Sequence, residues 1–120
     1  MAGALEEYNR KRDFQKTKEP PGKAARAHSR LRFVVQHHSA WKDHYDLRLE
    51  WEGVMLSWAV PKGPSYNPRD KRLAVQTEDH PIEYRDFEGT IPEGEYGGGV
   101  VMIWDEGTWE PQYDFNPDEG

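Results

Sequence analysis

A strictly alternating stretch, residues 44–51, constrains the fold of this 120-residue chain more than any other feature. Successive side chains of a β-strand point to opposite faces of the sheet. The even positions of the stretch are polar and the odd positions apolar: His44, Asp46, Arg48 and Glu50 against Tyr45, Leu47, Leu49 and Trp51. The pattern predicts a strand whose charged face holds a ligand and whose other face is apolar.

The flanking segments predict further strands. Residues 32–38 and 54–60 are rich in β-branched and aromatic residues, and short connections to residues 44–51 favour antiparallel pairing. Later strands are predicted over 72–78, 100–104 and 107–110, with loops over 61–70 and 88–99. Residues 4–15 favour a short helix, and residues 82–87 a helical turn or loop. Short strands separated by turn signals are typical of an all-β sandwich or barrel.

The composition fits one domain over residues 1–120. Five Trp, six Tyr and four Phe can fill a modest core. The absence of cysteine excludes disulfides, thiolate metal sites and thiol nucleophiles, and it suits a cytoplasmic location. No apolar run approaches the roughly 20 residues of a membrane span, and the N-terminus lacks the apolar region of a signal peptide. No membrane partner is therefore expected.

Charge is distributed unevenly along the chain. The net charge of −6 argues against a protein that coats nucleic acid through bulk charge. Residues 1–32, however, carry nine Lys or Arg against four Asp or Glu, whereas residues 33–120 carry seven against eighteen. A basic arm over residues 1–31 would contact phosphates, unless it is simply a frayed terminus. The acidic tail, residues 111–120, is expected to be loose.

Two histidines and one carboxylate form a candidate metal site. A hairpin would bring His38 beside His44, and Asp46 projects from the same face as His44. This donor set suits Mn²⁺, Fe²⁺ or Zn²⁺. His37 competes with His38, although parity along the strand favours His38. The alternative is that His44 and Asp46 form an ordinary surface pair.

Other polar residues extend the candidate site. Arg48, beside a bound cation, would bind an anion such as phosphate, or else balance the charge of Asp46 or Glu50. His80 and Tyr84 follow the strand predicted over 72–78. His80 would be a third metal ligand, a general acid, or a surface histidine before a proline. The glycine-rich segment 94–99 lacks the Gly-Lys-Ser/Thr of a P-loop and is interpreted as a turn rimming the site.

Four motifs, in order, resemble the 3'-phosphoesterase module of bacterial multifunctional DNA ligase D, which also occurs alone in archaea and bacteria. They are Phe33-Val34-Val35-Gln36 with His38-x5-His44-Tyr45-Asp46-Leu47-Arg48-Leu49-Glu50; Trp58-Ala59-Val60-Pro61-Lys62-Gly63-Pro64-Ser65; Glu78-Asp79-His80-Pro81-x-x-Tyr84; and Asp86-Phe87-Glu88-Gly89-x-Ile91-Pro92-x-Gly94-x-Tyr96-Gly97. The resemblance runs from about Arg12 to Trp109. The family usually has Lys at position 37 and Leu at position 43, where this chain has His37 and Asp43.

The resemblance implies a compact, mostly β fold, an antiparallel β-barrel with one or two short helices. Because the predicted strands stop near Trp109, short of the C-terminal strands of the ligase-linked modules, a smaller or more open barrel is expected, with a weaker phosphomonoesterase step. The implied activity is Mn²⁺-dependent healing of 3' ends in DNA repair. A 3'-terminal ribonucleoside is removed from a primer strand, and the remaining 3'-phosphate is then removed to leave a 3'-OH. The implied partners are primer–template 3' ends and a DNA ligase and polymerase of an end-joining system.

Matched positions also imply the roles of individual residues. The implied metal ligands are His38, His44 and Asp46, and the implied contacts to the scissile phosphate are Arg48, His80 and Tyr84. Further catalytic positions are Arg12, Asp13, Glu19 and Glu78, and further residues near the substrate are Gln36, Lys62 and Arg72.

Two other functions fit the same residues. In one, His44-x-Asp46 and a distal histidine form the two-His-one-carboxylate triad of a non-haem iron oxygenase. In the other, the protein binds nucleic-acid 3' ends through its basic arm without catalysis.

Overall fold

The computed structural model describes residues 5–23, 30–40, 42–65 and 67–111. Its strands are β1 (Leu31–Ser39), β2 (His44–Trp51), β3 (Val54–Val60), β4 (Val75–Pro81), β5 (Gly89–Ile91) and β6 (Gly99–Trp109). The helical elements are α1 (Glu6–Arg10) and the 3₁₀ helix η1 (Ile82–Asp86). The prediction of a mostly β fold with one or two short helices is confirmed.

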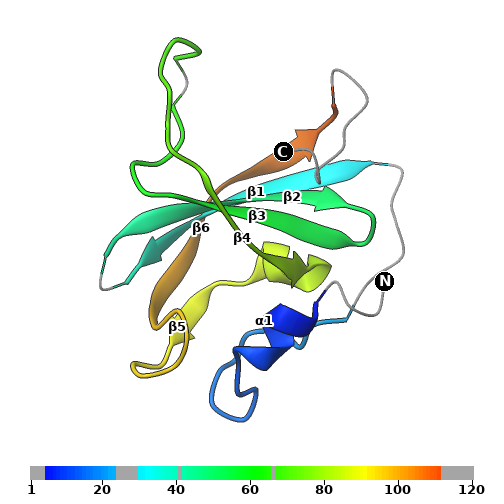
Figure 1. Ribbon diagram of the computed structural model, residues 1–120, viewed down its shortest axis with the longest axis vertical. Helices are drawn as coiled ribbons and strands as arrows, with labels where there is room; N and C mark the ends of the chain where they lie inside the picture. Colours follow the sequence, from blue (N-terminus) through cyan, green and yellow to red (C-terminus); the bar gives the residue numbers. More distant parts are fainter. Residues whose placement is uncertain (1–4, 24–29, 41, 66, 112–120) are drawn as a thin grey trace.

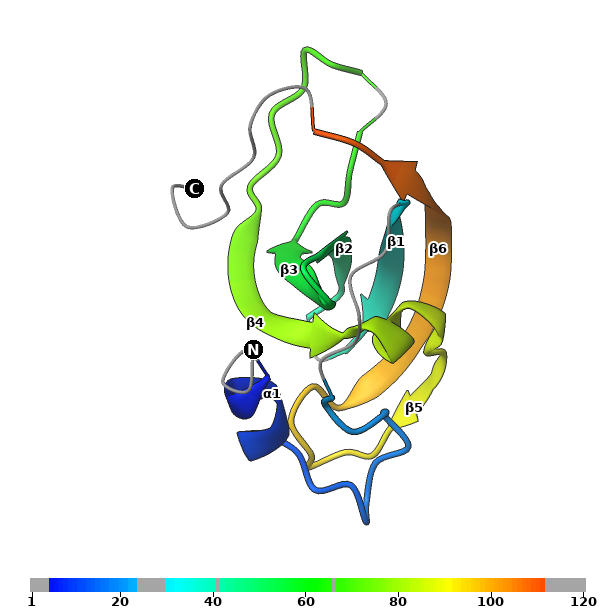
Figure 2. The same cartoon turned by 90° about the vertical axis from the view of Figure 1, so that its right-hand side faces the viewer.

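The six strands form one antiparallel sheet in the order β4-β3-β2-β1-β6-β5. The sheet curls into a half-barrel, so that β4 and β6 lie on opposite sides of its interior (Figure 2). The loop between β3 and β4 projects at one end, and α1 and β5 lie toward the other (Figure 1). The barrel is thus open, with β4 and β5 as its edges.

The charged face of β2 points into the half-barrel. Asp46, Arg48 and Glu50 are buried, whereas Leu47 and Leu49 on the opposite face are only half-buried. Buried charges persist when they are paired and hydrogen-bonded. In the described part of the chain, every buried side-chain nitrogen or oxygen has a hydrogen-bond partner. The predicted alternation is confirmed, and the structure shows that its polar side is the interior one.

The N-terminal segment closes one end of this interior. Tyr8 of α1 is fully buried, and its hydroxyl donates a hydrogen bond to the Pro20 carbonyl. A small apolar core joins α1, β3 and η1: Leu5, Tyr8, Val54, Leu56 and Tyr84. Residues 5–23 of the basic arm are therefore folded onto the sheet, and the frayed-terminus alternative is wrong for them. Residues 1–4, 24–29 and 112–120 lie outside the described structure, and with them most of the acidic tail.

The helix predicted over 4–15 is shorter than expected, because α1 ends at Arg10. The fourth strand is also shifted. It spans Val75–Pro81 rather than 72–78, and His80 lies within it instead of following it. Leu73 lies before the first residue of this strand and is 69% exposed, so its apolar side chain does not pack against the sheet. Pro81 is tolerated because β4 is an edge strand, where a missing N–H costs little.

The C-terminal strands differ from the prediction as well. Residues 100–104 and 107–110 belong to one strand, β6, because it pairs with β1 along its length and absorbs one irregularity opposite Val35 and Gln36. Gly107 fits this pairing because a Cβ there would meet the Phe33 ring at 2.9 Å. Part of the predicted loop 88–99 forms β5, which pairs with β6.

Within the described residues, no helix is long and apolar enough to cross a membrane.

Candidate active site

A cavity of about 310 Å³ opens from the interior of the half-barrel. It is lined by nine of the predicted site residues together with five others: His38, His44, Asp46, Arg48, His80, Tyr84, Arg12, Glu19 and Glu78, with Ala59, Thr77, Ile91, Tyr96 and Gly97. These residues come from the loop after α1, from β1 to β5 and η1, and from the loop before β6.

The three predicted metal ligands, His38, His44 and Asp46, meet at one wall of the cavity and are called the metal-ligand group below. His38 of β1 lies directly across from His44 of β2 in the sheet register. One donor atom from each histidine and one from Asp46 lie within 4.8 Å of one another. The Asp46 carboxylate is 3.3 Å from His44 Nε2 and 3.8 Å from His38 Nδ1.

Backbone carbonyls orient both rings. His44 Nδ1 donates to the Lys42 carbonyl at 3.1 Å, and His38 Nε2 donates to the Gly97 carbonyl at 2.7 Å. A carbonyl oxygen only accepts, so these nitrogens carry the protons. The other nitrogens, His38 Nδ1 and His44 Nε2, therefore turn their lone pairs toward Asp46. Such carbonyl partners are what usually set the tautomer of metal-binding histidines.

The electrostatics of the group fit a cation. A proton added to His44 Nε2 would form a hydrogen bond with the Asp46 carboxylate, which otherwise faces the lone pair of that nitrogen. This hydrogen bond raises the pKa of His44. Burial alone would raise the pKa of Asp46, but the His44 hydrogen bond and the charge of Arg48 bring it below its ordinary value. A divalent ion could replace that proton, and two imidazoles with one carboxylate suit a borderline transition metal.

Arg48 lies next to the metal-ligand group. Its guanidinium is 3.5 Å from the Asp46 carboxylate and 4.7 Å from the centre of the Tyr84 ring. Its Nε donates to Gln36 Oε1 at 2.7 Å, and the Gln36 amide donates to the carbonyls of Tyr84 and Phe87. Gln36 thus holds Arg48 from behind and does not line the cavity itself.

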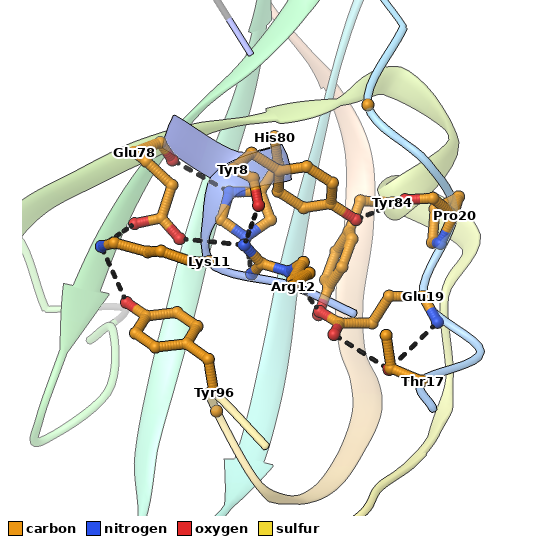
Figure 3. Close-up of polar contacts among 12 residues, drawn as sticks. Tyr8, Lys11, Arg12, Thr17, Glu19, Pro20, Glu78, His80, Tyr84 and Tyr96 are labelled. Atoms are coloured by element: carbon orange, nitrogen blue, oxygen red, sulfur yellow. Dashed lines mark hydrogen bonds and ion pairs between the residues drawn. The ribbon is translucent and has the colours of Figure 1, made fainter. Parts of the chain in front are cut away.

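The opposite wall is an ion-pair network centred on Arg12 (Figure 3). The guanidinium contacts Glu19 at 2.9 Å and Glu78 at 3.3 Å, and it stacks on Tyr8 with 3.9 Å to the ring centre. All three charged side chains are no more than 4% exposed. The Tyr84 hydroxyl donates to Glu19 at 2.6 Å, and burial raises the pKa of Tyr84, so the hydroxyl stays protonated.

His80 links this network to β4. Its Nδ1 donates to the Glu78 carbonyl at 2.9 Å, and its Nε2 accepts from Arg12 at 3.3 Å. Burial, reinforced by the positive charges of Arg48 and Arg12, holds the pKa of His80 well below 6.5. Both ring nitrogens already have partners outside the metal-ligand group. This geometry makes His80 a neutral member of the Arg12 network and argues against the alternative that it is a third metal ligand.

The lowered pKa of His80 predicts an acid-sensitive fold. The unfolded chain takes up this proton near pH 6.5, whereas the folded chain does so only at lower pH. Stability is therefore present above pH 6.5 and lost as the pH falls below it. Between pH 7.5 and 5.5, His80→Gln should lose about 1 kcal/mol less unfolding free energy than the wild type, as measured by urea denaturation. Equal pH dependence in the two proteins would contradict a neutral His80.

Comparison with known proteins shows the family of the chain. Residues 36–119 match the family described as the DNA Ligase D 3'-phosphoesterase domain. The chain belongs to this family. It is 57% identical over 118 residues to the multifunctional non-homologous end joining protein LigD of Pseudomonas aeruginosa, covering 97% of this chain and 14% of that protein.

Two mycobacterial LigD proteins are similar over nearly the same span. The one from Mycobacterium tuberculosis is 50% identical over 113 residues, covering 93% of this chain and 15% of that protein. The one from Mycolicibacterium smegmatis is 48% identical over 120 residues, covering 99% of this chain and 16% of that protein. This phosphoesterase domain therefore spans about a seventh of the length of these relatives.

The two positions at which this phosphoesterase domain departs from the usual residues lie away from the cavity. His37 faces the other side of β1, where its ring stacks near Tyr45 and lies 3.9 Å from Asp43. The Asp43 side chain is 64% exposed. The structure places His38, as strand parity predicted, and not His37, in the metal-ligand group.

Besides Gln36, three more predicted site residues do not line the cavity. Asp13 is exposed, and its carboxylate accepts a hydrogen bond from the Gln15 N–H in a turn. Lys62 is exposed in the loop after β3, and Arg72 pairs with Asp70 at 3.5 Å. Their functional roles stay predictions that rest on the family resemblance.

The cavity also contains residues that were not among the predicted site residues, above all Tyr96 and Gly97. Both lie in the fourth motif of the family resemblance and in the glycine-rich segment, which predicts only a turn at the rim. Gly97 has a φ of +76°, which favours glycine, and this conformation presents its carbonyl to His38. Lys11 reaches the same rim by donating hydrogen bonds to Glu78 and Tyr96.

Proposed function

We propose that this domain is a metal-dependent hydrolase that processes 3' ends of nucleic-acid strands in end joining. It removes a 3'-terminal ribonucleoside from a primer strand and then the 3'-phosphate that remains. The observation that carries the proposal is the placement of Arg48 beside the His38, His44 and Asp46 group in one cavity. Such an arrangement suits a phosphate held between a cation and a guanidinium. The end-joining role rests on the names of the LigD relatives.

The metal that we propose is Mn²⁺. Its ligands would be His38 Nδ1, His44 Nε2 and the Asp46 carboxylate, a donor set that suits this ion. When bound, the ion would supply Lewis acidity to a non-bridging phosphate oxygen. Arg48 binds the same phosphate and stabilises the charge that grows on its oxygens. Tyr84 donates its hydroxyl proton to Glu19 and supports the Arg48 guanidinium with its ring.

In the net diesterase reaction, the oxygen of water adds to phosphorus and the bond to the 5' oxygen of the terminal nucleoside breaks. The nucleoside leaves with a proton from water, and the primer keeps a 3'-phosphate. In the second step, the oxygen of another water adds to phosphorus and the bond to the 3' oxygen of the primer breaks; that oxygen takes a proton from the water to become the 3'-OH, and inorganic phosphate leaves. A neutral His80 is a poor proton donor, so we assign it the role of orienting Arg12 at the cavity wall.

A primer–template with a single 3'-ribonucleotide tests the proposal. With Mn²⁺, the primer should shorten by one nucleoside and end first in a 3'-phosphate and then in a 3'-OH that a polymerase and ligase can use. A second primer that already carries a 3'-phosphate isolates the second step. No shortening with any divalent metal would refute the proposal. The same turnover without oxygen separates it from the oxygenase alternative, and product formation separates it from simple end binding.

A further inference from the structure

Tyr96 differs from every other side chain of the cavity. It lies in the loop between β5 and β6 and is 46% exposed, whereas Tyr84, the other tyrosine of the lining, is 2% exposed. Its ring belongs to no apolar core of the described structure. An aromatic side chain left open at the mouth of a charged cavity is poorly explained by packing alone.

The protein nevertheless holds Tyr96 in place. Two turn hydrogen bonds, from Glu95 N–H to the Pro92 carbonyl and from Gly98 N–H to the Glu95 carbonyl, shape its loop. The next residue, Gly97, is bonded to His38 of the metal-ligand group. The residue next to Tyr96 in the loop is therefore fixed to the wall that carries the metal-ligand group.

The network on the other wall holds the ring as well. Lys11 Nζ donates to the Tyr96 hydroxyl at 3.3 Å and to Glu78 at 3.2 Å (Figure 3). The Lys11 amine and the Arg12 guanidinium lie 4.7 Å and 5.3 Å from the centre of the ring. Tyr96 is thus positioned at the mouth, between the two walls that would hold the phosphate.

We propose that the Tyr96 ring is a stacking platform for a nucleobase next to the scissile phosphate. This rests on the proposed function. A phosphate fits among the buried charges of the cavity. A base attached to that phosphate has to extend out through the mouth, where Tyr96 lies. Aromatic rings bind bases of any sequence, because every base has a π-face.

The scissile phosphate has two neighbouring bases, and the two reaction steps distinguish them. The terminal base is present only in the diesterase substrate. The penultimate base is present in both the diesterase substrate and the 3'-phosphate substrate. Measurement of kcat/KM for both primers, with Mn²⁺, therefore assigns the base.

Tyr96→Ala should lower kcat/KM for the 3'-ribonucleotide primer by about 10- to 100-fold, mainly through KM. Tyr96→Phe keeps the ring and should remain within about threefold of the wild type, because stacking needs the ring and not the hydroxyl. Trp104→Ala is the matched control. Trp104 is 44% exposed, similar to Tyr96, but it lies on the outer face beside Tyr45 and should leave both activities unchanged.

A loss confined to the first primer assigns the terminal base, and a loss with both primers assigns the penultimate base. Wild-type activity in Tyr96→Ala overturns the proposal, and so does an equal loss in Tyr96→Phe. Fluorescence anisotropy of a labelled primer–template without metal gives a separate readout, in which Tyr96→Ala should weaken binding and Tyr96→Phe should not. This readout tests stacking even if the wild-type chain processes no 3' end, which would refute the proposed function alone.

Discussion

Replacing Asp46 with asparagine should abolish Mn²⁺ binding and 3'-end processing together. Asp46 is the single carboxylate of the metal-ligand group in the described structure, and it lies 3.3 Å from His44 and 3.5 Å from Arg48. Without the negative charge of Asp46, the cation would meet only two neutral imidazoles and the positive guanidinium of Arg48. Loss of an outer-shell partner alone typically lowers metal affinity 10- to 100-fold, so loss of this ligand should exceed about 100-fold.

Calorimetric Mn²⁺ titration and the 3'-ribonucleotide primer assay measure the two losses. Asp43→Asn is the matched control, because that carboxylate is near in sequence but 64% exposed on the other face of the sheet. It should leave both quantities unchanged. Tight Mn²⁺ binding by Asp46→Asn, or an equal loss in Asp43→Asn, would refute the assignment of the metal site.

Replacing Arg12 with alanine should destabilise the fold by about 3–5 kcal/mol. Its guanidinium is the shared partner of Glu19 and Glu78, whose side chains are 1% and 4% exposed. Removal leaves two buried carboxylates close together with too little positive charge. The Thr17 and Tyr84 hydroxyls that donate to Glu19 offset only part of this cost.

Urea denaturation at pH 7 measures the loss of unfolding free energy. Arg10→Ala is the control: Arg10 is 73% exposed, pairs with Glu7 only at the surface, and should change stability by less than about 0.5 kcal/mol. Adding Glu19→Gln to Arg12→Ala should recover part of the loss, because it removes one of the unpaired charges. Similar effects of the two arginine substitutions would show that the Arg12 network does not stabilise the fold.

Local sequence was sufficient for the centre of the sheet. β1, β2 and β3 lie within one residue of their predicted bounds, because alternation and short turns specify neighbouring antiparallel strands. The same parity separated His38 from His37 and placed His44, Asp46 and Arg48 on one face. The edges were harder, since β4, β5 and the full length of β6 depend on which strand each one pairs with.

Polar pattern alone did not reveal which face of β2 would be buried. A charged face is usually the solvent face, but here the interior contains partners for each charge. Arg48 finds Gln36 on the neighbouring strand, and the N-terminal segment covers the opening. Burial of these charges is a result of the assembled half-barrel and not of any local signal.

The strands β1 to β3, and the placement of His38, His44, Asp46 and Arg48 on one face, could be predicted from local pattern, because they depend on contacts between strands joined by short turns. Only the tertiary structure brought Arg12 to Glu78 and His80, residues 66 and 68 positions away. It also placed Tyr96 at the mouth of the cavity. Contacts between distant segments leave no periodic pattern in the chain, so their partners become known only when the sheet has curled and α1 has packed against it.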